Sequence, residues 1–201
     1  MRKAIQLSLF LTTLFLVSCN QGEEGVTISE ADKESTIVLG DSISKIAQAT
    51  LMQNVSKAMK EGGPVHAVEF CNLRAIPLTD SISKAHQVII ERVTDKNRNP
   101  TNNLSTENDR TAWEKFKSAF SSQSVEPVHY LHEENETLVY YKPIAIGMPT
   151  CLKCHGTPGQ DVDEATAQKI KEKYPNDKAM KYQLGDLRGM WKITFADAIK
   201  N

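Results

Sequence analysis

The feature that most constrains this chain is a five-residue motif, Cys151-Leu152-Lys153-Cys154-His155. It has the form C-x-x-C-H, the attachment signature of a c-type haem. Two intervening residues place both sulfurs along one porphyrin edge, and the next residue offers its imidazole to the iron. Gly156 and Pro158 follow, so we expect the motif to end in a turn and not in a continuing helix.

Two other chemistries use a C-x-x-C spacing. A structural zinc site needs four ligands, usually a second Cys pair or a His pair, and the sequence has no second pair. A thioredoxin-like redox site lies on a βαβ pattern, which this neighbourhood lacks. Covalent attachment of one haem c is therefore the preferred interpretation.

The N-terminus predicts export. Met1-Arg2-Lys3 is a short positive region, and residues 4–17 are mostly apolar but too few to span a bilayer. Leu16-Val17-Ser18-Cys19 has the form of a lipobox, and this end of the chain resembles bacterial lipoprotein precursors. The resemblance implies a signal peptide over residues 1–18 and a diacylated Cys19. An ordinary signal peptide with an incidental cysteine is the alternative.

Export and haem attachment support each other, because cytochrome c maturation in bacteria takes place outside the inner membrane. We expect the mature chain in the cell envelope, facing the periplasm and anchored to a membrane by lipid. The formal net charge is -1 over 201 residues, which argues against a nucleic-acid partner. A redox or signalling partner protein is expected, and the sequence does not name it.

Residues 19–35 are polar and acidic and predict a tether, followed by one domain over residues 36–201. Apolar spacing predicts helices at about 36–60 and 64–85, divided by Gly62 and Gly63. Pro77 should kink or split the second helix. The remaining elements are expected as a strand within 86–94, a helix opened by a capping box of Thr106 and Asp109, a hairpin of strands at 128–131 and 137–145, a helix at 163–174 and a strand at 190–195. We expect an α+β fold whose helices gather on one side of an antiparallel sheet.

The second axial position decides the chemistry of an iron already bound by His155. Cys71 remains unpaired once the other cysteines take lipid and haem, and it lies on the apolar stripe of its predicted helix. Its alternative role is that of a small buried apolar residue. The other candidates are His66, His86, His129, His132, Met148, Met180 and Met190, or no residue at all.

Five ordered blocks resemble a bacterial single-haem c domain family first described structurally in cyanobacteria, with a PAS-like fold. The blocks are residues 67–72, Arg92-Val93-Thr94 with residues 98–102, residues 151–156, residues 174–179 and residues 184–189. The resemblance implies a covalent haem c, a PAS-like antiparallel sheet, and axial ligands that correspond to His155 and Cys71. Thr94 stands where family members often carry serine.

Arg92, Arg98 and Arg188 are candidates to hold the haem propionates, because a guanidinium matches a carboxylate in a bidentate fork. Surface charge is the alternative for each. Aromatic residues such as Tyr140, Tyr141 and Trp191 are weaker candidates to pack on the porphyrin. His155 should donate its remaining ring hydrogen to a carbonyl or carboxylate that the sequence does not identify.

Three functions fit these features. A haem with two protein ligands has no open position, which favours a non-enzymatic role in redox or gas sensing or as a plain electron carrier. A small periplasmic haem enzyme of peroxidase type, with an open distal site and a purely structural Cys71, is the alternative. The chain carries no kinase or cyclase domain, so a sensor would act through its partner.

Overall fold

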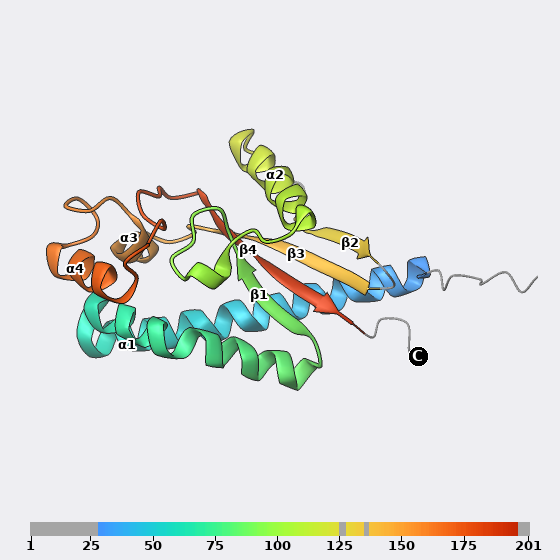
Figure 1. Ribbon diagram of the computed structural model, residues 1–201, viewed down its shortest axis with the longest axis horizontal. Helices are drawn as coiled ribbons and strands as arrows, with labels where there is room; N and C mark the ends of the chain where they lie inside the picture. Colours follow the sequence, from blue (N-terminus) through green and yellow to red (C-terminus); the bar gives the residue numbers. More distant parts are fainter. Residues whose placement is uncertain (1–27, 125–127, 135–136, 197–201) are drawn as a thin grey trace, which may run out of the picture.

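A long helical hairpin, α1 (Glu30–His86), lies along one face of the sheet in the computed structural model (Figure 1), which describes residues 28–124, 128–134 and 137–196. Its two arms run antiparallel and are separated by non-helical angles at Gly62 and Gly63. Gly63 has φ 71° and ψ -166°, a combination essentially restricted to glycine. The predicted break between two helices is thereby confirmed.

The first arm begins earlier than the sequence suggested. Ser29 caps the helix by accepting a hydrogen bond from the Asp32 amide, and the Asp32 carboxylate accepts one from the Ser29 amide. This capping box satisfies two amides that the helix itself leaves free. Residues 30–35, which were expected to belong to the tether, are therefore helical. The helix also continues through Pro77, so the split predicted there does not occur.

Four antiparallel strands form the sheet, in the order β1-β4-β3-β2. Their bounds are β1 Ile89–Val93, β2 Tyr130–Glu134, β3 Thr137–Ala145 and β4 Leu187–Phe195. The hairpin of β2 and β3 was predicted, although β2 lies two to three residues later than expected. The last strand starts at Leu187 instead of residue 190.

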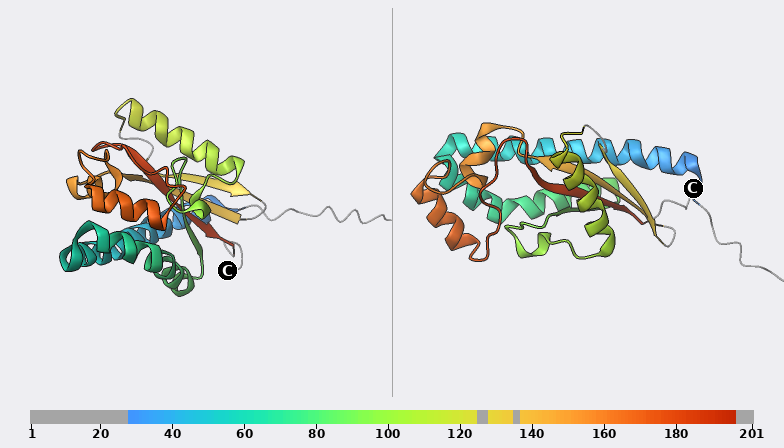
Figure 2. Two further views of the ribbon diagram at one scale, coloured as in Figure 1. Left: turned by 60° about the vertical axis from the view of Figure 1, so that its left-hand side comes forward. Right: turned by 90° about the horizontal axis from the view of Figure 1, so that it is seen from above.

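Helices cover both faces of the sheet, which corrects the expectation that they gather on one side (Figure 2). The α1 hairpin covers one face, where Tyr140 packs with Ile43 and Ala47. The helix α2 (Glu107–Ser121) covers the other face, where the adjacent Tyr141 packs with Trp113 and other apolar residues. Successive residues of a strand point to opposite faces, and both faces of β3 and β4 are apolar, so both require a cover. The α+β class is confirmed.

The helices α3 (Pro149–His155) and α4 (Glu164–Lys173) lie beside the bend of α1, at one end of the molecule (Figure 1). The short η1 (Pro100–Asn102) follows β1 in the chain and contacts it. Lys169 of α4 forms an ion pair with Glu69 of α1 at 2.9 Å, and Ile170 packs on Val68. This contact fixes the second arm of α1 next to α3 and α4. Within the ranges described, no helix has the length and apolar character needed to cross a membrane.

Candidate functional site

The C-x-x-C-H motif forms the short helix α3. Pro149 begins it at a position where a missing amide hydrogen has no cost, and Gly156 ends it, as predicted. A Cβ on Gly156 would lie 2.7 Å from the Leu152 carbonyl oxygen and closer still to Asp161, so the chain can turn here only at a glycine. Residues three apart lie on the same side of a helix. The two thiols of the motif are therefore presented together.

His155 is held in one orientation by the backbone. Its Nδ1 lies 2.9 Å from the carbonyl oxygen of Ala179, so Nδ1 carries the proton and donates it there. This carbonyl is the partner that the sequence could not identify. Burial lowers the pKa of His155 well below its usual range, and the charges of Arg188 and Arg98 lower it further. The imidazole is therefore neutral with Nε2 unprotonated, the form in which histidine binds a metal.

Arg98 connects the loop before η1 to the motif. Its Nε donates to Asp177 at 3.1 Å, and its Nη2 donates to Asp177 at 3.2 Å and to the Cys154 carbonyl at 2.6 Å. The side chains of both ion-pair partners are largely buried, at 12% and 7% exposure. Arg98 thus fixes the end of α3, and two of its three nitrogens are engaged by the chain itself. Its predicted role at a propionate stays a prediction.

Cys71 lies on the second arm of α1, between two apolar clusters. Val68, one turn earlier, packs against α4, while Ala75 and Leu78 pack on the cluster between α1 and the sheet. Cys71 is partly buried, as its place on the apolar stripe predicts. Burial raises the pKa of its thiol, and the charges of Arg92 and Arg98 act against that rise.

Cys71 and the motif are electrostatic neighbours. Burial raises the pKa of Cys154 to about 11; Arg98 opposes the rise and Cys71 adds to it. The same arginine therefore acts on both thiols, although 83 residues separate them in sequence. Val68, one turn before Cys71 on α1, packs in the same cluster as Cys154, so the fold brings Cys71 to the part of the molecule that holds the motif.

The two other predicted arginines differ in their surroundings. Arg92, in β1, is exposed. Arg188, in β4, is partly buried and donates through Nη1 to the Lys96 carbonyl at 3.4 Å. Burial lowers the pKa of Arg188 to about 10. Its Nε is buried and has no hydrogen-bond partner among the described residues.

Most of the alternative axial residues lie away from the motif or are otherwise engaged. His66 is exposed and faces Glu61, and His129 stacks on Tyr140. Met190 is fully buried beneath α2, and Met148 is 46% exposed. Met180 does lie near the motif, where it packs in the same cluster as Cys154. Met148 caps the start of α3, so Cys71, Met180 and Met148 are the sulfur-bearing candidates beside the motif.

The residues present fit a haem better than a bare metal ion. Within the described ranges, no three His, Cys, Asp or Glu residues come together in a way that could hold a metal ion. A porphyrin supplies four nitrogen ligands itself, so it needs from the chain only axial groups and points of attachment. Cys151, Cys154 and Cys71 are free thiols, and His155 has an unprotonated Nε2.

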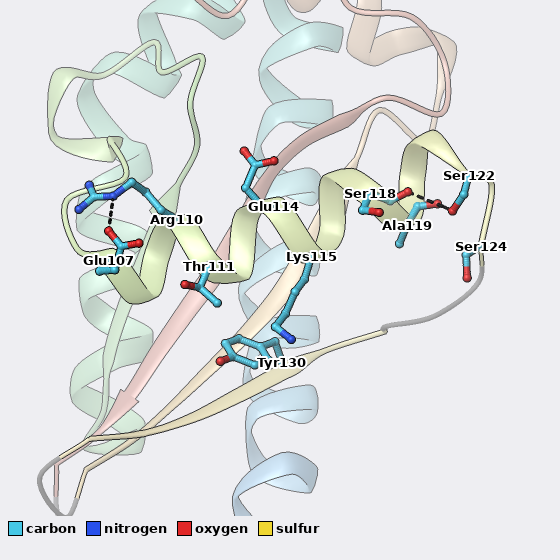
Figure 3. Close-up of a pocket in the computed structure, with 10 residues that line it drawn as sticks. All are labelled: Glu107, Arg110, Thr111, Glu114, Lys115, Ser118, Ala119, Ser122, Ser124 and Tyr130. Carbon is cyan, nitrogen blue, oxygen red and sulfur yellow. Dashed lines mark hydrogen bonds and ion pairs between the residues drawn. The ribbon is translucent and has the colours of Figure 1, made fainter.

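A separate groove lies between α2 and β2 (Figure 3). It has a volume of about 830 Å³ and is wide open. Lys115 lies over the ring of Tyr130 at 4.9 Å, and charged residues of both signs, such as Glu107 and Arg110, line it. None of the residues predicted to bind the cofactor lines this groove, so it does not form part of the site.

Sequence reasoning did not identify Tyr182. Its ring meets His155 edge-on, with 6.3 Å between the ring centres, while Tyr140, Tyr141 and Trp191 belong to the sheet cores. Ala179 was missed as a partner for a different reason. It acts through its backbone carbonyl, which gives no side-chain signal. Ala179 is the last residue of the block 174–179, and Tyr182 lies just beyond it. That this block follows the motif in the sequence was the available clue that its residues contribute to the site.

The fold and the site together define a class of α+β proteins with a C-x-x-C-H helix set against a helical hairpin. The family model for the Tll0287-like family matches residues 24–196, and the chain belongs to this family. The structure also matches one titled "Crystal structure of the cyanobacterial heme-protein Tll0287", with 25% sequence identity and a TM-score of 0.57. The match covers 79% of this chain and 94% of that chain. A comparison with curated proteins finds no match.

Proposed function

We propose that this chain is an exported protein with one covalently attached haem c, bound axially by His155 and Cys71, that acts in electron transfer or in redox or gas sensing. The orientation of His155 carries the proposal. Its Nδ1 is bonded to the Ala179 carbonyl, and the same short helix presents two free thiols. Membership of a family with a solved heme-protein supports it.

Each residue has a defined task in this proposal. Cys151 and Cys154 form thioethers with the two vinyl groups, and His155 binds through Nε2. Cys71 binds as a thiolate, which lowers the reduction potential of the iron. The positive charges of Arg92 and Arg98 stabilise that thiolate against the cost of its burial. The bound haem would supply one-electron exchange.

Covalent attachment is tested by mass spectrometry of the chain produced together with a haem c maturation system. We expect a mass increase of one haem that survives extraction with acidified organic solvent. The double variant Cys151→Ala/Cys154→Ala should lose it, while Lys153→Ala, an exposed change within the motif, should retain it. A chain that gains no haem, or whose haem is extracted, would refute this part of the proposal.

Sensing and electron transfer differ in whether Cys71 is released. A carrier keeps both ligands during a reversible one-electron titration. A sensor loses the bond between Cys71 and the iron on reduction. CO or NO then binds to the ferrous iron, at a rate limited by the breaking of that bond. The peroxidase-type alternative requires a five-coordinate, high-spin ferric state that reacts rapidly with peroxide, and a six-coordinate ferric state would exclude it.

The cellular setting belongs to the same proposal. A diacylated Cys19 would anchor the domain to a membrane, facing the periplasm, where a partner protein exchanges electrons or receives a signal. Cys19 lies outside the described residues. The PAS-like character of the sheet also remains part of the proposal.

A further inference from the structure

Two buried polar atoms beside His155 form no hydrogen bond of ordinary geometry among the described residues, although the Tyr182 hydroxyl also interacts with the Thr94 and Arg188 side chains. They are Nε of Arg188 and the hydroxyl oxygen of Tyr182, whose residue is only 5% exposed. Buried polar groups are nearly always hydrogen-bonded, so each exception requires an explanation. Both groups are donors, and together they match an acceptor with two oxygens, such as a carboxylate.

Tyr182 is fixed between the motif and a group of cations. Its amide donates to the His155 carbonyl at 3.0 Å, and its ring packs in one cluster with Cys151 and Leu152. Lys96 Nζ lies 4.0 Å from the centre of the ring, and the Arg188 guanidinium carbon lies 5.4 Å from it. These contacts hold the ring of Tyr182 beside the motif.

The cations around Tyr182 lack an acidic partner. Among the described residues, Arg188 takes part in no ion pair, and Lys96 Nζ donates to the Met180 carbonyl instead of to a carboxylate. The neighbouring Arg98 differs, because Asp177 already neutralises it. Asp177 acts on Arg188 without forming an ion pair with it, so the positive charge of Arg188, next to His155, would stabilise an anionic group.

We propose that Arg188 Nε and the Tyr182 hydroxyl together bind one propionate carboxylate of the haem, on the His155 side of the site. This inference rests on the proposed function. It assigns a role to Tyr182, and it distinguishes Arg188 from Arg98, whose guanidinium is committed to Asp177. The Thr94 side chain anchors the backbone of Arg188, because its Oγ1 donates to the Arg188 carbonyl at 3.0 Å.

The test is resonance Raman spectroscopy of the haem-loaded chain, which reports hydrogen bonding to propionates through their bending band. Tyr182→Phe keeps the ring and its contacts and removes only the hydroxyl. We expect it to shift this band while the bands that report iron spin and coordination stay unchanged. Tyr130→Phe, in the groove between α2 and β2, is the matched control and should leave every band in place.

Arg188→Gln provides a second, independent measurement. Removing a positive charge beside the iron disfavours the electron-rich ferrous state, so the midpoint potential should fall. Arg188→Lys should restore most of the potential but not the position of the propionate band. The exposed Arg110→Gln should change neither quantity.

An unshifted propionate band in Tyr182→Phe would overturn the inference even when the haem is attached and its coordination is normal. A chain that carries no haem at all would instead overturn the proposed function on which the inference rests. The two failures are therefore distinguishable in the same samples.

Discussion

At the scale of single residues, Asp109 joins α2 to the sheet through a buried carboxylate. It is fully buried and accepts hydrogen bonds from the amides of Ser105 and Thr106 and from the Tyr141 hydroxyl, at 2.9–3.0 Å. Lys192 of β4 lies 3.1 Å from it. These hydrogen bonds and the Lys192 ammonium together compensate the negative charge of the buried Asp109 carboxylate.

We expect Asp109→Asn to lower the free energy of unfolding by about 2 kcal/mol, because the hydrogen bonds to the buried carboxylate would weaken and Lys192 would keep only its longer contact with Glu91, at 3.4 Å. Chemical denaturation followed by circular dichroism measures the change. Asp80→Asn, at an exposed position on α1, is the control and should alter stability by less than about 0.5 kcal/mol. Equal effects of the two changes would contradict the role assigned to Asp109.

The same carboxylate predicts a dependence of stability on pH. Burial raises the pKa of Asp109, but hydrogen bonds from Thr106 and Lys192 outweigh burial and hold the pKa below its usual value. The folded state therefore binds this proton less readily than the unfolded state. The contribution is complete above about pH 4 and is lost as the pH falls through the lower folded pKa. Stability of Asp109→Asn should fall less steeply than wild type in that acid range.

The sequence predicted one half of this arrangement. The capping box of Thr106 and Asp109 is local, so four residues of sequence are enough to indicate it, and the structure confirms it. The contacts with Tyr141 and Lys192 join residues 32 and 83 positions further along the chain. No local pattern indicates such a pairing, because it depends on how the sheet and α2 pack.

At the scale of elements, the bend at Gly62 and Gly63 determines where Cys71 lies. It reverses the direction of α1 and places the second arm against α4 and α3. In the sequence, the two glycines predict an interruption of the helix. The direction of the second arm follows instead from tertiary contacts such as the ion pair of Lys169 with Glu69. The glycines therefore made the helix break predictable, whereas only the apolar stripe and the family resemblance pointed to Cys71 at the site.

Gly63→Ala should lower the free energy of unfolding by about 2 kcal/mol, because a Cβ is strained at φ 71° and ψ -166°. Denaturant titration measures this change. Gly147→Ala is the matched control, since φ there is not in the left-handed region and a Cβ would meet nothing within 4 Å. A stable Gly63→Ala protein would show that the bend does not require glycine.

At the scale of the whole molecule, the site is assembled from α1, the loop before η1, α3, the loop after α4, and β4, which are distant in sequence. The contiguous motif could be predicted, because attachment chemistry requires its residues and spacing. The residues that orient it, such as Ala179 and Tyr182, come from a loop without a regular pattern. The helices on both faces of the sheet were missed because the buried positions of β3 and β4 were not assigned to separate faces.

The proposed lipid anchor makes a prediction for the complete chain in a bacterial cell. Cys19→Ser should move the protein from the membrane fraction to the soluble periplasmic fraction, because the acyl chains that hold it would be absent. Labelling with a radioactive fatty acid should disappear in the same variant. Cys71→Ser should stay in the membrane fraction, and a chain that partitions identically with and without Cys19 would contradict lipid anchoring.

The proposed axial binding of the haem iron by His155 and Cys71 is tested most directly by electron paramagnetic resonance of the ferric, haem-loaded chain, with and without Cys71. The account predicts a low-spin signal typical of histidine and thiolate ligation in the wild type, and its loss in Cys71→Ala. Met180→Ala should keep the wild-type signal, because the second axial position is assigned to Cys71, although Met180 also packs beside Cys154. An unchanged signal in Cys71→Ala would contradict the assignment of Cys71 as the second axial ligand.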